Sequence, residues 1–107
     1  MAGPRPILVV DDDDTLRQLL AEQLQHGGEL ETIEATSVAT ARELLKKPGA
    51  RYDAMLLDIT LPDGDGRDFC AELRREGVRM PIIILTGSDD ESDIVRRSEE
   101  HTSELRH

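Results

Sequence analysis

The sequence predicts an α/β fold in which helices flank a doubly wound parallel sheet. Three short apolar runs, at residues 7–10, 54–57 and 82–85, show no alternation of polar and apolar positions. Such continuous runs are typical of strands that are buried on both faces. Pro, Gly or Asp bounds each run, and amphipathic helical patterns fill the intervals between them. Strands that alternate with helices along a chain indicate a parallel sheet.

The first helix is expected over residues 14–25, directly after the first strand. Four leucines share one face of this segment: Leu16, Leu19, Leu20 and Leu24. Asp13 and Asp14 are expected to begin this helix, because an aspartate caps a helix N-terminus and suits its dipole. Two glycines, at positions 27 and 28, end it. A more polar run follows at residues 30–35 and is expected to form an edge strand.

The second and third helices are expected over residues 37–47 and 66–76. Val38, Ala41 and Leu45 share a face of the second helix, and a Pro-Gly pair stops it. The third helix turns its apolar side inward, and Gly77 ends it; that side consists of Phe69, Cys70 and Leu73. The expected order is therefore β-α-β-α-β-α-β, with the start of another helix near Asp90.

Composition limits the classes of function. The chain has 107 residues, enough for one domain, and 23 acidic against 13 basic residues give a net charge of −10. This balance argues against binding nucleic acid or an anionic membrane through this segment. The single cysteine excludes an internal disulfide and a thiolate metal cluster. With no run of transmembrane length and no signal-peptide core at the N-terminus, a cytoplasmic location is expected.

Chemically capable residues follow three of the predicted strands. If the strand order is 2-1-3-4, the first, third and fourth strands are neighbours, about 4.8 Å apart. They lead into Asp11 and Asp12, into Asp58 and into Thr86, respectively. Because ligands of open parallel sheets bind beyond the carboxyl ends of the strands, these side chains are expected to share one pocket.

A cluster of carboxylates favours a hard divalent cation such as Mg²⁺, which takes oxygen ligands. A carboxylate can also act as a nucleophile toward phosphorus. A metal pocket, a nucleophilic aspartate and a hydroxyl donor together indicate phosphoryl transfer onto an aspartate.

Three segments carry a family resemblance: ILVVDDDDTLRQLL, YDAMLLDITLPDGDG and MPIIILTGS. Over roughly residues 7–95 the chain resembles the receiver domain of a bacterial two-component response regulator. The combination is specific, although each segment alone would be a weak signal. The resemblance implies a flavodoxin-like doubly wound sheet of strand order 2-1-3-4. It also implies a fifth strand ending in lysine and a fifth helix, both of which the chain is expected to lack.

The resemblance implies a role for each site residue. Asp58 would accept a phosphoryl group from a histidine kinase or phosphotransfer protein. Asp11 and Asp12 would hold Mg²⁺ together with Asp58 and the backbone carbonyl of Thr60. Thr86 would bind the phosphoryl group and switch the surface near the fourth strand and helix. Such a domain is a signalling phosphoacceptor with self-catalysed transfer and dephosphorylation, not an enzyme, and a downstream output domain or effector is the further partner.

Other positions of the motif take supporting roles in the same resemblance. Pro62 and Gly66 would shape the loop after Asp58, and Thr60 and Ser88 would tune access of water to the acyl phosphate. The missing lysine would pair with phosphoryl oxygens, so its absence bears on phosphorylation of this chain.

The last residues differ in character from the rest. RSEEHTSEL, at residues 97–105, resembles the in-frame translation of a sequencing adapter, and no apolar residue lies between Val95 and Leu105. We therefore expect residues 1–96 to be a receiver domain that is incomplete at its C-terminus, and residues 97–107 to be an artefactual tail.

Two other functions compete with the phosphoacceptor. Haloacid-dehalogenase-like phosphatases also follow a hydrophobic strand with Asp-x-Asp-x-Thr, which would make Asp11 the nucleophile and Asp13 the acid/base. That hypothesis leaves Asp58 and LPDGDG without a role. The other alternative is an inert receiver-fold interaction module. A calcium loop fails on spacing from either Asp11 or Asp63, because the required Gly and Glu are not both present.

Overall fold

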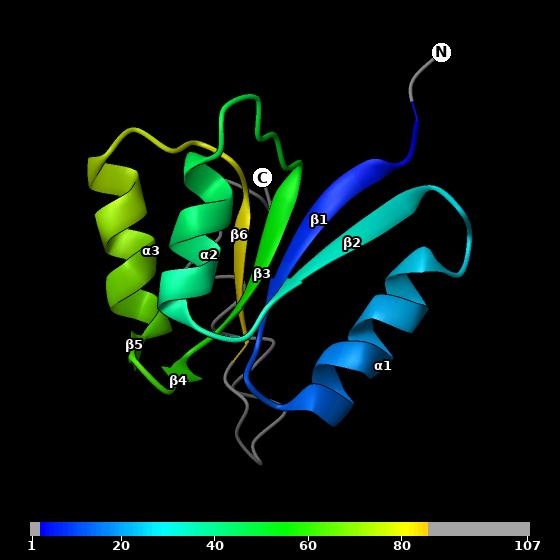
Figure 1. Ribbon diagram of the computed structural model, residues 1–107, viewed down its shortest axis with the longest axis horizontal. Helices are drawn as coiled ribbons and strands as arrows, with labels where there is room; N and C mark the ends of the chain where they lie inside the picture. Colours follow the sequence, from blue (N-terminus) through cyan, green and yellow to red (C-terminus); the bar gives the residue numbers. More distant parts are fainter. Residues whose placement is uncertain (1–2, 86–107) are drawn as a thin grey trace.

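The computed structural model describes residues 3–85 as a three-layer α/β arrangement (Figure 1). Four parallel strands form the sheet in the order β2-β1-β3-β6. Helix α1 lies on one side of this sheet, and α2 and α3 lie on the other. The strands are β1 (Arg5–Val10), β2 (Leu30–Ala35), β3 (Ala54–Asp58) and β6 (Ile82–Leu85), and the helices are α1 (Asp14–Gln25), α2 (Val38–Lys46) and α3 (Gly66–Arg75).

The predicted sheet is confirmed. Strand β6 is the fourth strand of the sequence pattern, so the expected order 2-1-3-4 is the observed one. The polar strand β2 lies at the edge, as expected. One element was not predicted, a short antiparallel hairpin of β4 (Thr60–Leu61) and β5 (Gly64–Asp65) directly after β3. The expected helix near Asp90 lies outside the described residues.

Each helix begins at a polar cap that satisfies free backbone N–H groups. The Asp13 carboxylate accepts a bond from the N–H of Leu16 at 3.1 Å, so Asp13 caps α1 as predicted. Ser37 accepts from the N–H of Thr40 at 3.1 Å at the start of α2. Asp65 starts α3 in the same way.

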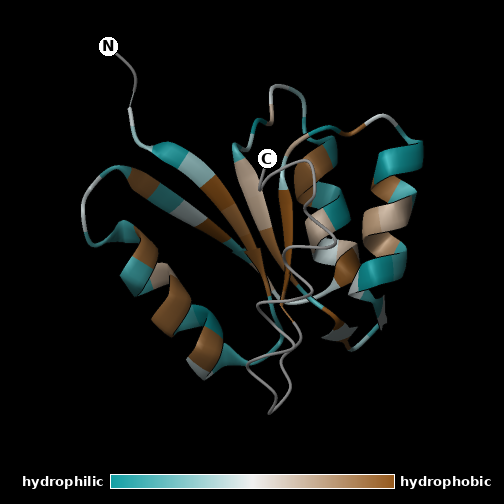
Figure 2. Cartoon of the chain, turned by 180° about the vertical axis from the view of Figure 1, so that it is seen from behind, coloured by the Kyte–Doolittle hydropathy of each residue, from teal (hydrophilic) through white to brown (hydrophobic). Residues whose placement is uncertain are grey.

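The hydrophobic core lies between the sheet and helices α2 and α3. Figure 2 shows the apolar colouring concentrated on the central strands. Fully buried side chains of β1, β3 and β6 meet Phe69 and Leu73 of α3; the strand residues are Leu8, Val10, Met55, Leu57, Ile82 and Ile84. Each large apolar side chain buried in this way stabilises the fold by roughly 1.5–3 kcal/mol.

Burial on both faces is confirmed only for β1. Leu8, Val9 and Val10 are 0% exposed, whereas burial alternates along β6 between buried Ile84 and half-buried Ile83. Helix α1 packs mainly against β1 and β2, so within the described residues the second face of β3 and β6 is less covered.

The predicted apolar face of α1 is confirmed for the half-buried Leu16, Leu20 and Leu24 and was wrong for Leu19. Leu19 is 50% exposed, and the buried residues of the helix are Arg17 and Ala21. These two residues are four apart and lie on one side of the helix. The helix turns this side inward because Arg17 finds acidic and carbonyl partners beneath it. No helix among the described residues is long and apolar enough to cross a membrane.

Candidate functional site

An acidic pocket forms at the carboxyl end of the sheet. Strands β1 and β3 pair in parallel with Val10 opposite Leu57, so Asp11 and Asp58 follow at neighbouring positions. Asp11, Asp12 and Asp58 each place a carboxylate oxygen within 4.8 Å of the others. The structure therefore brings together three of the predicted site residues from two strands.

Strand β6 pairs with β3 beside Asp58. Asp58 is in register with Leu85, the last residue of β6, and Thr86 comes next in the sequence. Thr86 and Ser88 lie outside the described residues, so their predicted roles stay predictions. Thr60 lies on β4 with an exposed side chain, and the metal-binding role of its carbonyl is likewise untested.

Asp58 is a buried carboxylate in an unfavourable setting for charge. Its side chain is only 6% exposed. Burial raises the pKa of Asp58 to about 6, and the nearby charge of Asp11 adds to this shift. Backbone N–H groups of Thr60 and Ile59 act in the opposite direction but do not cancel it.

Asp11 is more deeply buried, at 1% exposure. Burial raises its pKa as well, against the effect of the Asp13 N–H, which donates to Oδ1 at 2.9 Å. Its other oxygen, Oδ2, and Oδ1 of Asp58 have no hydrogen-bond partner among the described residues. Leaving buried acceptors unsatisfied is costly. Two such oxygens beside exposed Asp12 form a donor set that fits a hard cation such as Mg²⁺.

The four adjacent aspartates divide into two pairs. Asp11 and Asp12 belong to the pocket, whereas Asp13 caps α1 and Asp14 forms an ion pair with Arg17 at 2.7 Å. A phosphatase of the Asp-x-Asp type would use Asp13 as an acid/base. Since the Asp13 carboxylate is bonded to the first turn of α1, the geometry does not favour that alternative.

Gly66 supports the backbone of Asp58 by the absence of a side chain. Its N–H donates to the carbonyl of Ile59 at 2.6 Å. A Cβ at this position would collide with the carbonyl oxygen of Asp58. Only glycine allows α3 to begin this close to the end of β3.

Asp63, in the turn of the β4–β5 hairpin, ties this loop to α2. Its two carboxylate oxygens accept bonds from the N–H groups of Val38 at 2.8 Å and Ala39 at 2.9 Å. These bonds lower the pKa of Asp63. The sequence alone did not predict this contact. Asp63 lies 25 and 24 residues from its two partners, and the residue types give no sign that they meet.

Arg17 is the second residue that sequence reasoning missed. Its guanidinium donates to the carbonyl oxygen of Asp11 at 2.9 Å and to Glu34 at 2.8 Å. The available signal was an arginine three residues after Asp14, within a helix of otherwise apolar inward residues.

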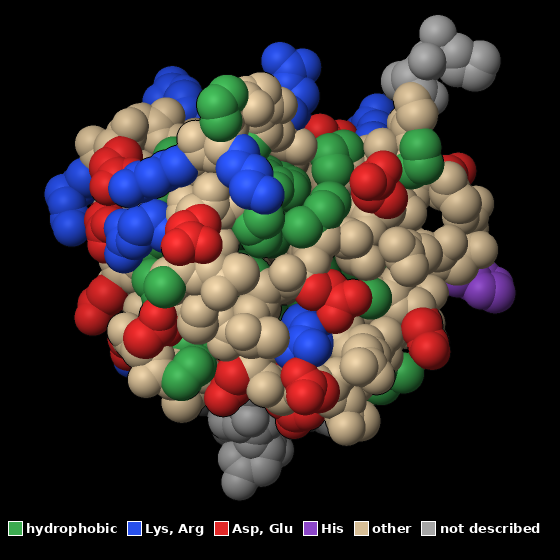
Figure 3. Space-filling view, in the orientation of Figure 1, with side chains coloured by type: hydrophobic (Ala, Val, Ile, Leu, Met, Phe, Trp, Pro, Cys, Tyr) green, Lys and Arg blue, Asp and Glu red, His purple; other side chains and the backbone are tan. Residues whose placement is uncertain are grey.

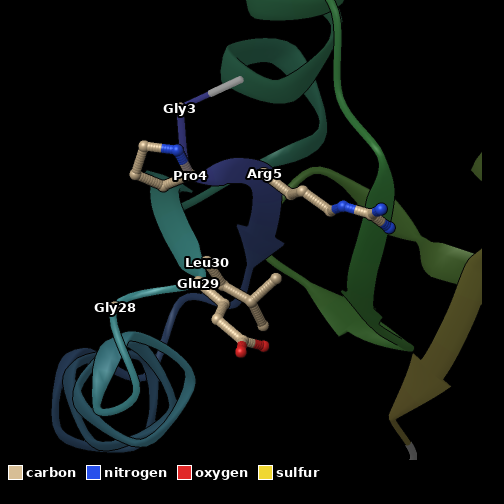
Figure 4. A pocket seen from close by; sticks show the side chains of 6 residues that line it. All are labelled: Gly3, Pro4, Arg5, Gly28, Glu29 and Leu30. Carbon is tan, nitrogen blue, oxygen red and sulfur yellow. The ribbon is translucent and has the colours of Figure 1, made fainter. Parts of the chain in front are cut away.

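A separate hollow lies at the other end of the sheet (Figure 4). It has a volume of about 730 Å³ and lies where β1 and β2 begin; its lining is Gly3, Pro4, Arg5, Gly28, Glu29 and Leu30. The carboxylates of the acidic pocket lie where these strands end, so the hollow is not part of that pocket.

Two transcriptional regulators are similar to this chain. The alkaline phosphatase synthesis transcriptional regulatory protein PhoP of Bacillus subtilis is 35% identical over 92 residues, covering 85% of this chain and 37% of PhoP. The KDP operon transcriptional regulatory protein KdpE of Escherichia coli is 34% identical over 87 residues, covering 81% of this chain and 37% of KdpE. The chain thus spans a little over a third of the length of these relatives.

Solved structures are similar as well. The response regulator TrrA from Thermotoga maritima, in complex with Mg²⁺–BeF, has a TM-score of 0.69 and 35% identity, covering 79% of this chain and 71% of TrrA. The BeF₃-activated receiver domain of RstA from Klebsiella pneumoniae has a TM-score of 0.72 and 28% identity, covering 92% of this chain and 81% of that one. The sequence model of the response regulator receiver domain family matches residues 7–104. The chain therefore belongs to this family.

Proposed function

We propose that this chain is the phosphoacceptor module of a phosphorelay, in which Asp58 accepts a phosphoryl group in a Mg²⁺-dependent reaction. The observation that carries the proposal is a pair of buried carboxylate oxygens beside Asp12, one on Asp11 and one on Asp58, that have no partner within residues 3–85. A structural cluster of acids would have its buried acceptors satisfied. This one leaves two buried acceptors without a partner among the described residues, which supports binding of a cation there.

In the proposed reaction, a carboxylate oxygen of Asp58 attacks the phosphorus of a phosphohistidine. The new P–O bond forms as the P–N bond breaks. The electron pair of the broken P–N bond stays on the imidazole nitrogen. Asp58 must be ionised to attack, so protonation of its carboxyl group slows the reaction. Its pKa of about 6 refers to the pocket without a cation, and bound Mg²⁺ would lower it. Mg²⁺, when bound, neutralises charge on the carboxylates and the phosphoryl oxygens.

Asp11, Asp12, Asp58 and the carbonyl of Thr60 would hold the ion. Asp11 is fixed by the N–H of Asp13, whereas Asp12 is exposed and free to adjust. Thr86 would bind the phosphoryl oxygens and change the surface near β6 and the helix after it. Thr60 and Ser88 would control the approach of water to the acyl phosphate.

The partners are proposed at the level of class. A histidine kinase or phosphotransfer protein would supply the phosphoryl group, and an output domain or effector would read it. The similar regulators PhoP and KdpE are longer than this chain, which supports an output segment beyond it. The proposed location is the cytoplasm, with no nucleic acid bound through this segment.

We also propose that residues 1–96 form the receiver domain, with residues 97–107 a non-native tail. The similarity of residues 97–105 to a translated sequencing adapter supports this division. Resequencing the source DNA from a library made without that adapter tests it. The proposal expects a different sequence after residue 96, one that contains a strand ending in lysine; the same eleven residues would contradict it.

The phosphoacceptor is tested by incubating the chain with acetyl phosphate and Mg²⁺ and measuring its intact mass. We expect one phosphoryl adduct that disappears in Asp58→Asn and persists in Asp68→Asn, a matched change on the exposed first turn of α3. An adduct that survives in Asp58→Asn but is lost in Asp11→Asn would favour the phosphatase instead. A folded chain without any adduct would leave either the inert module or an effect of the incomplete C-terminus.

A further inference from the structure

Arg17 joins three segments at the edge of the acidic pocket. It is 8% exposed, although arginine is rarely buried without partners. One guanidinium nitrogen donates to the carbonyl oxygen of Asp11, and Nε donates to Glu34 at 2.8 Å. The third nitrogen pairs with Asp14 at 2.7 Å. Each nitrogen of the guanidinium thus has an acceptor on a different residue.

The bond to Asp11 is the important one, because it reaches the main chain of a pocket residue. The N–H of Asp11 donates to the carbonyl of Ala35 at 3.0 Å, so both polar groups of its backbone are held. A fixed backbone limits the directions in which the Asp11 carboxylate can point. The Asp11 carboxylate, which has an oxygen within 4.8 Å of one of Asp58, is therefore held in place through its backbone.

Glu34 fixes Arg17 in turn. It is the residue before Ala35 on the edge strand β2, and its carboxylate is 37% exposed. The planar guanidinium donates in fixed directions, so the bond to Glu34 sets the orientation of the bond to Asp11. The positive charge of Arg17 also favours the ionised form of Asp11. Lysine could supply the charge but not three directed bonds.

We propose that Arg17 is a positioning residue for the cation site, which acts on Mg²⁺ affinity through the backbone of Asp11 and is itself oriented by Glu34. The inference rests on the proposed function, since it concerns the same pocket. Hydrogen-bonded residues behind metal ligands typically change affinity by about 10- to 100-fold when they are removed.

The alternative is that Arg17 only stabilises the fold by joining α1 to the sheet. Both roles predict a lower melting temperature for Arg17→Met, so stability does not separate them. Mg²⁺ affinity of the folded protein does, because a purely structural ion pair would leave the pocket unchanged once the chain is folded. Arg17→Lys and Glu34→Gln are milder changes that keep the fold testable.

The experiment is a Mg²⁺ titration followed by ¹⁵N–¹H NMR of the pocket amides, at a temperature where each variant is folded. We expect Arg17→Met to weaken Mg²⁺ binding by at least about tenfold, with smaller losses in Arg17→Lys and Glu34→Gln. Without Mg²⁺, the amide of Asp13 should shift in Arg17→Met, because it donates to the Asp11 carboxylate. Arg5→Met is the control, since Arg5 pairs with Asp53 where β1 begins, at the end of the sheet opposite the pocket.

The outcomes separate the two proposals. If the wild type binds Mg²⁺ and both Arg17→Lys and Glu34→Gln bind it with unchanged affinity, the positioning role is wrong and the proposed function stands. If the wild type shows no Mg²⁺-dependent shifts at the pocket amides, the proposed function falls and this inference falls with it. Weaker Mg²⁺ binding in both variants, with unchanged binding in Arg5→Met, supports the inference.

Discussion

Asp58 and the two aspartates that follow it, Asp63 and Asp65, differ in burial and in the direction of their pKa shifts. Asp58, at the end of β3, is buried, and its pKa is raised to about 6. Asp63 and Asp65, in the hairpin that follows, accept bonds from the starts of α2 and α3, and their pKa values are lowered. The satisfied aspartates hold helices in place, whereas Asp58 keeps an oxygen without a partner among the described residues. Unsatisfied acceptors therefore distinguish the acids of the pocket from those that cap helices better than charge does.

The same contrast holds for the two ends of the sheet. The acidic pocket lies where the strands end. At the opposite end, Lys and Arg side chains gather where α2 and α3 end (Figure 3). Lys46, Arg74 and Arg75 lie in these last turns, where the helix dipole favours positive charge. One end of the sheet gathers carboxylates, whereas at the other end basic residues occupy the last turns of α2 and α3.

The largest expected effect comes from Gly66→Ala. The added Cβ would collide with the carbonyl oxygen of Asp58, so either α3 or the end of β3 must move. We expect a loss of about 3 kcal/mol in the free energy of unfolding, measured by urea denaturation. Gly27→Ala, where a Cβ meets nothing within 4 Å, is the control. Equal stability of the two variants would contradict the close packing.

Asp58→Asn should abolish phosphorylation and yet stabilise the protein. The buried carboxylate of Asp58 destabilises the folded state when it is ionised, so a neutral amide of similar shape should add on the order of 2 kcal/mol at pH 8. Thermal unfolding of both proteins checks this. A less stable variant would mean that the charge of Asp58 is satisfied.

The pH dependence of the free energy of unfolding should also reflect the raised pKa of Asp58. Asp58 has a folded pKa of about 6 against an ordinary value of 3.8, so the folded state binds the proton more tightly. Protonated Asp58 favours the folded state over the unfolded state. This contribution to the free energy of unfolding is fully present below pH 3.8 or so and is lost as the pH rises through about 6. The difference in free energy of unfolding between wild type and Asp58→Asn should therefore grow from pH 4 to pH 7. A constant difference would contradict the shifted pKa.

The smallest effect is expected at Asp63. Its pKa is lowered, so its contribution to stability is present above its ordinary pKa and is lost as the pH falls through the lower, folded value. Asp63→Ala should lower the melting temperature slightly at pH 7, because the N–H groups of Val38 and Ala39 lose their acceptors. At acidic pH the two melting temperatures should converge. Glu43→Ala, at an exposed position in the middle of α2, should leave the melting temperature unchanged at both pH values.

Much of this architecture was predictable because it depends on local patterns. Caps and glycines set the bounds of α1, and the polarity of β2 identified the edge strand. The convergence of Asp11 with Asp58 followed from parallel strand order alone. Periodicity on its own could not set the rotation of α1, since a buried arginine with three acceptors outweighs the burial of Leu19.

Contacts between distant segments were not predictable from patterns. The bond from Val38 to Asp63 depends on how the β4–β5 hairpin turns, and the motif LPDGDG does not specify this. The same holds for Arg17 and Glu34, which meet only after α1 has packed against β2. Local sequence predicted which residues line the pocket. It did not predict the contacts that hold those residues in place, such as the bond from Arg17 to the carbonyl of Asp11.

The most direct test of the central claim is the ¹³C NMR titration of the Asp58 carboxyl group, assigned by its absence in Asp58→Asn. Without Mg²⁺, its pKa should be about 6. Saturating Mg²⁺ should lower that pKa, because a cation beside the carboxylate favours its charged form. A pKa near 3.8 that does not respond to Mg²⁺ would contradict the account, since the pocket would then be neither strained by buried charge nor able to accept a cation.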